Sequence, residues 1–201
     1  MSVRIEILSG AALARGIDAV ARLRMSVFRD WPYLYDGDLA YEADYLATFS
    51  KGAGSIIVAA IDGTEIIGAA TGSPLSQHTE EFGSLFVEQG LEQETIFYCG
   101  ESVLLSSYRG QGIGHAFFDH REGHARSLRD KDGHPIAQST FCGVIRSAED
   151  PRCPPDYQPL DGFWEKRGYQ KVPGLVGHYD WREVGDTAET RKDMQFWMRE
   201  L

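Results

Sequence analysis

The sequence has 201 residues, of which 42% are hydrophobic and 25% are charged, and its formal net charge at pH 7 is -10. This length fills one hydrophobic core and is short for two, so we predict a single domain over residues 1–201. The acidic balance disfavours nucleic acid and anionic membranes as partners. No apolar run approaches the roughly 20 residues of a bilayer span, and the charged first residues do not resemble a secretion signal, which predicts a cytoplasmic protein.

The first 50 residues are predicted to form a strand and two helices. Residues 3–8 have the composition of a short strand, and Ser9, a residue type that caps helices, follows them. Apolar residues then recur at helical spacing and predict a helix of three to four turns. Aromatic, proline and aspartate residues dominate 28–37, which favours a structured loop, and a second helix is predicted over about 39–49. The apolar positions of the first helix are Leu13, Ile17, Val20 and Ala21.

Two β-rich runs, at 55–61 and 64–70, flank the dipeptide Asp62-Gly63. This arrangement predicts an antiparallel hairpin, because both turn residues tolerate the positive φ angles of a type I′ turn. The acidic and weakly helical stretch 74–94 follows, and we interpret it as a connecting helix with loops.

A strand, a helix and a second strand are predicted in the middle of the chain. Residues 95–105 predict the first strand, and the glycine-rich segment 110–114 opens a helix that continues to about residue 128. Turn residues at 131–135 end this helix, and residues 136–141 predict the second strand. Such an order gives a parallel crossover, which together with the hairpin implies an α+β or mixed α/β fold.

The last part of the chain predicts two short strands between two helices. Residues 160–167 predict a helix that Gly168 stops, and strands at 169–172 and 176–184 are expected to pair around residues 173–174. Apolar residues at helical spacing predict an amphipathic C-terminal helix, which docks on its own chain or on a second subunit of a homodimer. These residues are Met194, Trp197, Met198 and Leu201.

The segment Arg-Gly-Gln-Gly-Ile-Gly at 109–114 has the composition of a phosphate-binding loop. Its three glycines lack the Cβ atoms that would block close approach, so successive backbone N–H groups can converge on one anion. The helix that begins there adds unpaired N–H groups and the positive end of its dipole, and Arg109 adds a full charge. A diphosphate is the ligand that this loop predicts.

Other glycine-rich loops agree less well with the spacing. A P-loop has a lysine directly after its glycines, which this segment lacks. A dinucleotide-binding turn needs Gly-x-Gly-x-x-Gly, and His115 stands in place of the third glycine when counting starts at Gly110. Asp130 or Asp132 lies about 20 residues downstream, as in that fold, so a nucleotide-dependent oxidoreductase is an alternative.

The segment 109–114 resembles the Arg/Gln-x-x-Gly-x-Gly/Ala signature of the GNAT superfamily of N-acetyltransferases. Residues 163–169, Phe-Trp-Glu-Lys-Arg-Gly-Tyr, resemble the family's late Phe-Tyr-x-x-x-Gly-Phe segment. The predicted order of strands and helices agrees along most of the chain. The resemblance implies a mixed, mostly antiparallel central sheet flanked by helices, with one pair of strands splayed apart, and acetyl-CoA as the acyl donor.

The resemblance also implies where the cofactor binds. The pantetheine arm would pair with the backbone of the strand at 101–105, and the thioester would lie where this strand separates from the next, at 136–142. A backbone N–H near Leu104 would polarise the thioester carbonyl. The cofactor-binding residues that follow are Val103, Leu104, Leu105, Arg109, Gly110, Gln111, Gly112, Ile113, Gly114, His115 and Phe163.

The transfer needs a base, because an alkylammonium with a pKa near ~10 has no free lone pair. Glu101 is the predicted catalytic base, since it lies on the strand that carries the thioester, where partial burial would raise its pKa toward neutrality. Trp164 stands where many family members have a tyrosine that protonates the departing thiolate, and an indole cannot do so. The thiolate then leaves unassisted, or Tyr98, Tyr157 or Tyr179 donates the proton.

The sequence gives less support to a covalent acyl-enzyme mechanism or to a metal site. Cys142 lies on the strand facing the opening, which would allow an acetyl-cysteine route, but a strand cysteine is more often a small buried apolar residue. Together with Cys99 and Cys153 it forms neither an even set nor a Cys-x-x-Cys pair, so reduced thiols are expected. His120 and His124 lie four apart on a helix but lack a third ligand, and no metal is predicted.

The predicted function is therefore direct transfer of an acetyl group from acetyl-CoA to an amine of a small molecule or an amino terminus. Residues 30–45 and 74–94 would form the acceptor site, because their carboxylates and aromatic rings can hold a cation. The alternative, prompted by Trp164, is a non-catalytic sensor that binds coenzyme A.

Overall fold

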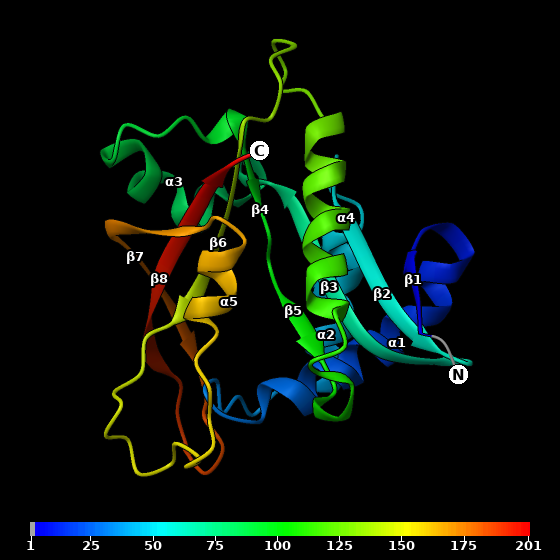
Figure 1. Ribbon diagram of the computed structural model, residues 1–201, viewed down its shortest axis with the longest axis vertical. Helices are drawn as coiled ribbons and strands as arrows, with labels where there is room; N and C mark the ends of the chain where they lie inside the picture. The colour runs from blue at the N-terminus through cyan, green and yellow to red at the C-terminus, as the bar shows by residue number, and fades with distance from the viewer. Residues whose placement is uncertain (1–2) are drawn as a thin grey trace.

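The computed structural model describes residues 3–201, without the side chains of residues 80 and 81, and its centre is an eight-stranded sheet. The strand order is β1-β2-β3-β4-β6-β8-β7, with β5 paired to β3; β4 and β6 are parallel, and the other pairs are antiparallel. This mixed, mostly antiparallel sheet flanked by helices confirms the predicted fold class (Figure 1). The strands are β1 Arg4–Ile7, β2 Ile56–Asp62, β3 Glu65–Pro74, β4 Ile96–Tyr98, β5 Ser102–Leu104, β6 Gln138–Val144, β7 Gln170–Trp181 and β8 Thr190–Glu200. The helices are α1 Gly10–Phe28, α2 Leu39–Phe49, α3 Thr79–Glu88, α4 Ile113–Ser127 and α5 Asp161–Lys166.

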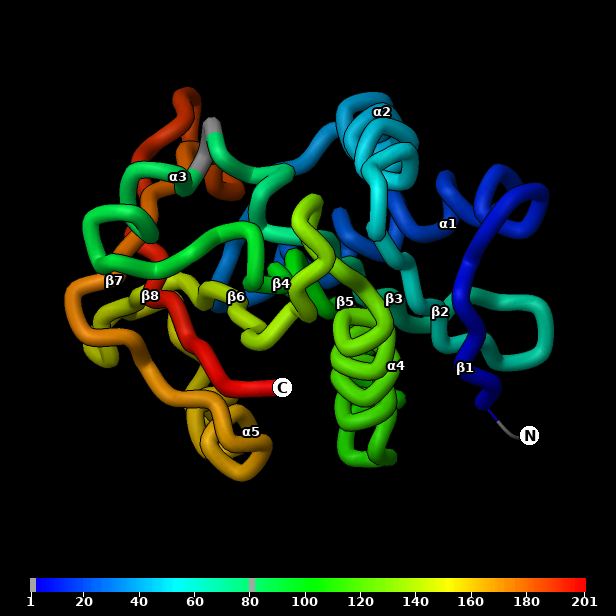
Figure 2. The backbone as a smooth tube through the Cα atoms, turned by 90° about the horizontal axis from the view of Figure 1, so that it is seen from above, coloured from blue at the N-terminus to red at the C-terminus, as the bar shows by residue number. Residues whose placement is uncertain are grey.

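Helices cover both faces of the sheet, with α4 and α5 on one face and α1, α2 and α3 on the other (Figure 2). Strand alternation sorts the apolar residues of β2 between the faces. Ile56 and Val58 pack in the core with α4, whereas Ile57 and Ala59 pack in the core with α1 and α2. Within residues 3–201, none of the helices has the length and apolar character required to cross a bilayer.

The predicted hairpin is present as β2 and β3, but its turn differs from the prediction. Asp62 pairs with Glu65 at the ends of the two strands, so Gly63 and Thr64 form the turn. Gly63 has a φ of 59°, whereas Thr64 has no positive φ, which excludes the type I′ geometry. Asp62 stays in the strand, where its Oδ2 accepts a hydrogen bond from the Tyr108 hydroxyl at 2.9 Å.

The first helix is longer than predicted, since α1 extends over 19 residues to Phe28. Ser9 occupies the N-cap position with an extended backbone, but its side chain makes no capping hydrogen bond. The predicted helix at 39–49 corresponds to α2, where the side chain of Asp38 accepts a hydrogen bond from the Tyr41 N–H at 2.9 Å and caps the helix.

The sheet divides where β4 ends. The N–H of Cys99 still donates to the Thr140 carbonyl of β6 at 2.8 Å. Gly100 and Glu101 then both face Thr71 of β3: the Gly100 N–H donates to the Thr71 carbonyl, and the Thr71 N–H donates to the Glu101 carbonyl, each at 3.1 Å. Two residues opposite one residue form a β-bulge, which redirects the strand.

Beyond this bulge the chain continues as β5, which pairs with β3 and diverges from β6 (Figure 1). The predicted strand at 95–105 is therefore two strands. The separation predicted beside 136–142 is present, and we call the region between β5 and β6 the split.

The predicted C-terminal helix is wrong, because the segment forms strand β8 between β6 and β7. Both faces of β8 are covered: Phe196 packs in the core with α3, and Trp197 packs in the core on the α4 side. A strand buried on both faces shows no clean alternation of apolar and polar residues. Met194 and Trp197, three apart, therefore imitate helical spacing although they belong to opposite faces.

The predicted pairing of 169–172 with 176–184 is also wrong. Residues 170–172 and 176–181 belong to one strand, β7, which pairs with β8 on both sides of an irregularity. The register shifts between Lys171 and Val176, so the residues around Pro173 and Gly174 are accommodated as an irregularity within β7. Pairing with β8 places β7 at the edge of the sheet.

Candidate active site

The glycine loop before α4 has the geometry of an anion cradle. Gly110 and Gly112 have φ angles of 75° and 82°, in the left-handed region that favours glycine, and no atom lies within 4 Å of a Cβ built on either residue. The first hydrogen bond of α4 runs from the Ala116 N–H to the Gly112 carbonyl at 3.1 Å. The N–H groups of Ile113 and Gly114 precede this bond, so they are free of helical partners and available to an anion.

The structure brings Phe163 to the same loop. Its ring lies 4.9 Å from the His115 ring, centroid to centroid, and a Cβ added to Gly114 would lie 3.4 Å from its Cζ. His115 also faces α5 through its Nδ1, which is 3.3 Å from an Nη atom of Arg167. Three of the predicted cofactor residues therefore meet where α5 packs against the start of α4.

The predicted residues of β5 offer mainly backbone groups. Val103 is fully buried in the core with α1, and Leu104 packs against the core on the α4 side. The Leu105 N–H donates to the Ile67 carbonyl of β3 at 3.0 Å. The backbone N–H and C=O groups of successive residues in a strand point to opposite sides. Those of Ser102 and Leu104 therefore point away from β3, toward the split.

Glu101 lies in a buried ionic cluster with Arg24 of α1 and Glu42 of α2. The exposed fractions of Arg24 and Glu42 are 9% and 0%, and the Arg24 guanidinium contacts both carboxylates. Burial opposes the charge of Arg24, but the coulombic effects of Glu101 and Glu42 outweigh burial and raise its pKa above its ordinary value. Arg24 was not predicted as a site residue, and Glu42 was included only as part of the acceptor segment 30–45. The only signal for Arg24 is a charged residue on the apolar stripe of α1.

Three tyrosines surround the split on the face of the sheet that Glu101 occupies. The Tyr98 hydroxyl is 3.4 Å from the Cys142 Sγ and 3.3 Å from the Tyr179 hydroxyl. Burial raises the pKa of Tyr98, and so do its contacts with Cys142 and Tyr179, so this hydroxyl keeps its proton at neutral pH. Burial likewise raises the pKa of Tyr33, with further contributions from the nearby Cys142, Tyr157 and Glu101.

Trp164 lies on the opposite face, packed into the core on the α4 side. Its ring is 5.0 Å from the Phe141 ring and 5.2 Å from the Trp197 ring. A Cβ added to Gly143 of β6 would come within 3.2 Å of the indole. Glycine at position 143 therefore makes room for the tryptophan, whose role here is packing.

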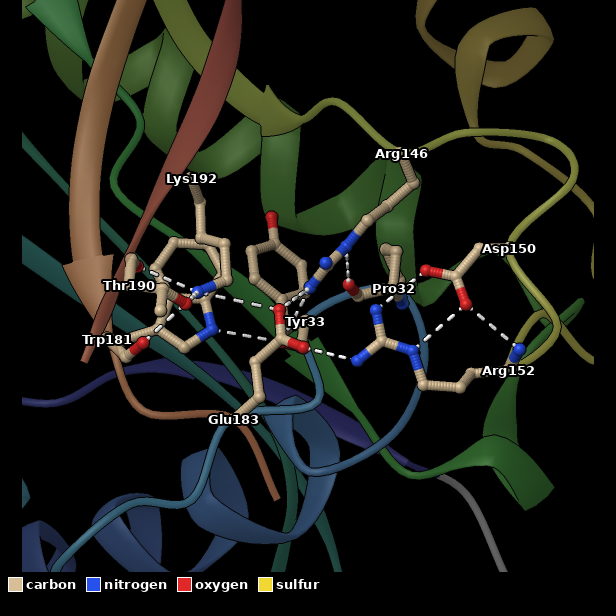
Figure 3. A network of polar contacts seen from close by, with 9 residues as sticks. All are labelled: Pro32, Tyr33, Arg146, Asp150, Arg152, Trp181, Glu183, Thr190 and Lys192. Atoms are coloured by element: carbon tan, nitrogen blue, oxygen red, sulfur yellow. Dashed lines mark hydrogen bonds and ion pairs between the residues drawn. The ribbon is translucent and has the colours of Figure 1, made fainter. Parts of the chain in front are cut away.

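A polar network around Glu183 holds the loop that carries Tyr33 (Figure 3). Arg146 donates from Nε to the Pro32 carbonyl at 2.6 Å and from Nη2 to the Tyr33 carbonyl at 3.1 Å. Its Nη2 also lies 2.8 Å from Oε1 of Glu183, a residue only 4% exposed. Lys192 approaches the same carboxylate at 3.5 Å, and Arg152 contacts its second oxygen. This network fixes the position of Tyr33 beside the split.

The substitution Glu183→Gln is expected to lower the free energy of unfolding by about 3 kcal/mol at pH 7, because it leaves the buried Lys192 and the 13% exposed Arg146 without their carboxylate. Burial alone would raise the pKa of Glu183, but hydrogen bonds from Arg152 and Arg146 outweigh it and lower this pKa. The stabilisation is therefore complete above the ordinary glutamate pKa and is lost as the pH falls through the lowered one.

Urea unfolding of both proteins between pH 7 and pH 3 measures this effect, and the two unfolding free energies should converge at the acidic end. Glu189→Gln is the matched control, since Glu189 is exposed in the same connection between β7 and β8. Equal urea midpoints for wild type and Glu183→Gln at pH 7 would show that the network does not stabilise the fold.

Two groups of possible metal ligands have local structural roles. His124 uses its Nε2 in a contact of 2.9 Å with the Gly54 carbonyl, so it is not paired with His120 on a shared ion. Asp130, Asp132 and His134 lie within reach of one ion, but Asp130 already accepts the N–H groups of both other residues at 2.9 and 2.7 Å. These bonds explain the cluster as a turn.

Comparison with known proteins agrees with this geometry. Residues 18–133 match the sequence model of the acetyltransferase (GNAT) family, and no curated protein matches the chain. The solved structure of Arabidopsis thaliana NAA60 with a bisubstrate analogue has a TM-score of 0.62 at 13% identity, covering 100% of this chain and 99% of that chain. Ribosomal-protein-alanine N-acetyltransferase from Brucella melitensis has a TM-score of 0.61 at 13% identity, covering 98% and 99%. An aminoglycoside 6'-N-acetyltransferase complexed with coenzyme A has a TM-score of 0.59 at 17% identity, covering 100% and 97%.

Proposed function

Because this chain belongs to the acetyltransferase (GNAT) family, we propose that it transfers an acetyl group from acetyl-CoA to an amine, either of a small molecule or of an amino terminus. The observation that carries this proposal is the glycine loop at 109–115, which presents free N–H groups beside the split. Structures with the same fold have been solved with acetyl-CoA or coenzyme A, which supports the choice of donor.

The proposed donor site fits the residues that surround the loop. The diphosphate would lie on the amides of 110–115 beside Arg109, and the loop has open space where the Cβ atoms of Gly110 and Gly112 would be. The pantetheine arm would pass Phe163 and pair with the backbone of Ser102 and Leu104. The sulfur would then lie in the split, between β5 and β6.

The acceptor would approach from the opposite face of the sheet, past Tyr33. The amine nitrogen bonds to the acetyl carbon, and the N–H groups of β5 that face the split stabilise the oxyanion. Glu101 is the proposed acceptor of the amine proton. On protonation its carboxyl group would loosen its ion pair with Arg24, and Arg24 would keep Glu42 as its partner. The carbon–sulfur bond then breaks, and the thiolate takes a proton from a tyrosine hydroxyl, for which Tyr98, buried beside Cys142 at the split, is the candidate.

The segments proposed for the acceptor site contribute unequally. Residues 30–45 bring Tyr33 to the split and Glu42 to the ionic cluster, which supports their role. In the segment 74–94, Phe82 of α3 packs edge-on against Tyr98 at 5.3 Å, so this segment supports the wall of the site from behind.

Release of free thiol from acetyl-CoA, recorded across a panel of amines, amino-terminal peptides and aminoglycosides, tests the proposal. At least one acceptor should give release well above hydrolysis. A protein that binds coenzyme A but acetylates none of them would be the non-catalytic sensor that the indole at Trp164 also allows. Calorimetric binding of NAD in place of coenzyme A would favour the oxidoreductase instead.

A further inference from the structure

Arg121 is a buried arginine of α4 that lies beneath the bulge, and its exposed fraction is 1%. Its Nη1 donates to the Glu101 carbonyl at 2.9 Å and to the Thr71 carbonyl at 3.1 Å, and its Nη2 donates to the Ser102 hydroxyl at 2.9 Å. The guanidinium also lies 4.7 Å from the centroid of the Phe118 ring. All of its hydrogen-bond partners therefore belong to the place where the sheet divides.

The positive charge of Arg121 is stabilised by hydrogen-bond acceptors and not by a carboxylate. Within the part of the chain that the structure describes, no carboxylate lies within ion-pair distance of this guanidinium. A buried charge without a counter-ion is costly unless dipoles solvate it. Here the solvating dipoles are two backbone carbonyls and one hydroxyl, so the positive charge acts directly on the peptide groups of the bulge.

One of these peptide groups faces the split. The Glu101 carbonyl accepts both the Arg121 guanidinium and the Thr71 N–H, so it points toward β3. The N–H of Ser102 belongs to the same planar trans peptide and points the opposite way, toward the split. A peptide whose carbonyl accepts a charge-assisted hydrogen bond is a stronger donor at its N–H, because hydrogen bonds in a chain polarise one another.

We propose that Arg121 is a positioning residue of the transfer reaction, which fixes the bulge and strengthens the Ser102 N–H as a donor to the thioester carbonyl. The inference rests on the proposed function, since it assigns the oxyanion donor within that site to the Ser102 N–H rather than to the N–H near Leu104 that the family resemblance implies. Arg121 touches neither substrate, and it acts through the peptide between Glu101 and Ser102.

The test compares Arg121→Met, Arg121→Gln and Arg121→Lys, with Arg126→Met as the matched control. Arg126 lies on the same helix, but its side chain is half exposed and has no contact with the bulge. Removal of the charge should lower kcat by about tenfold or more with a small change in the KM for acetyl-CoA, because a pre-set oxyanion donor acts mainly in the transition state. Arg121→Lys should recover part of the rate, and Arg126→Met should remain within about twofold of wild type.

Infrared difference spectra of bound acetyl-CoA, labelled with carbon-13 at the carbonyl, give a readout that simple loss of structure would not move. The thioester band should lie at a lower wavenumber in wild type than in Arg121→Met, with Arg121→Lys between them. Equal bands together with an unchanged kcat would overturn the inference. If Arg121→Met does not fold, Arg121→Gln and Arg121→Lys are compared in its place. A lower kcat for Arg121→Gln than for Arg121→Lys supports the role, and equal kcat values for the two variants overturn it.

Failure of the proposed function would be recognised separately. A wild-type protein that releases no thiol with any acceptor contradicts acetyl transfer. The band of bound acetyl-CoA still reports whether Arg121 polarises the carbonyl in that case.

Discussion

Valine in place of Gly112 is expected to weaken coenzyme A binding by about a hundredfold, which corresponds to about 2.7 kcal/mol. Gly112 has a φ of 82° and is the N-cap of α4. A β-branched residue is strained in this left-handed conformation, so the loop would relax in the free protein and would have to return to the strained form on binding. The added methyl groups would also occupy the open space in front of the amides.

Titration calorimetry with coenzyme A measures the effect, and Gly123→Ala is the matched control on the same helix. A Cβ at position 123 meets no atom within 4 Å, and the residue has no positive φ. Alanine is favoured over glycine in a helix interior, so the control should bind normally and be slightly more stable. Normal affinity in Gly112→Val would show that the ligand does not contact this loop.

The substitution Glu101→Gln is expected to lower kcat by about a hundredfold or more while leaving the KM for acetyl-CoA nearly unchanged, because general base catalysis typically contributes about 10² to 10⁴. Steady-state rates at pH 7 with a saturating acceptor and varied acetyl-CoA measure kcat and this KM.

Glu42→Gln distinguishes catalysis from packing, because Glu42 is the other carboxylate on Arg24; its side chain is 1% exposed, and that of Glu101 is 10% exposed. If Glu101 acts only as a partner of Arg24, the two substitutions should reduce kcat and stability alike. If Glu101 takes the amine proton, only its own substitution should reduce kcat per folded molecule by this amount. Normal turnover in Glu101→Gln would remove it from the mechanism.

Features with local chemical causes were predictable from the sequence. The hairpin of β2 and β3 follows from two β-rich runs around a turn dipeptide, and α4 follows from the glycines that open it and the turn residues that end it. The position of Phe163 beside the loop was accessible only through the family resemblance, since nothing local indicates that α5 packs on α4.

Features that depend on distant partners were not predictable. β8 lies between two strands, and its double burial removed the alternation that would have distinguished it from a helix. Arg24 and Arg121 interrupt the apolar stripes of α1 and α4, which indicates that each has buried partners, but the partners lie on elements far along the chain. A sequence shows that a charge must be satisfied inside a fold without showing which group satisfies it.

Titration of the protein with coenzyme A, followed by calorimetry and by the amide resonances of residues 110–115, shows whether the glycine loop binds the donor. We expect a binding heat and saturable shifts in those amides, larger than in the amides of the connection between β7 and β8. No heat and no shift in the loop at millimolar coenzyme A would contradict the proposed donor site and the acetyl transfer built on it.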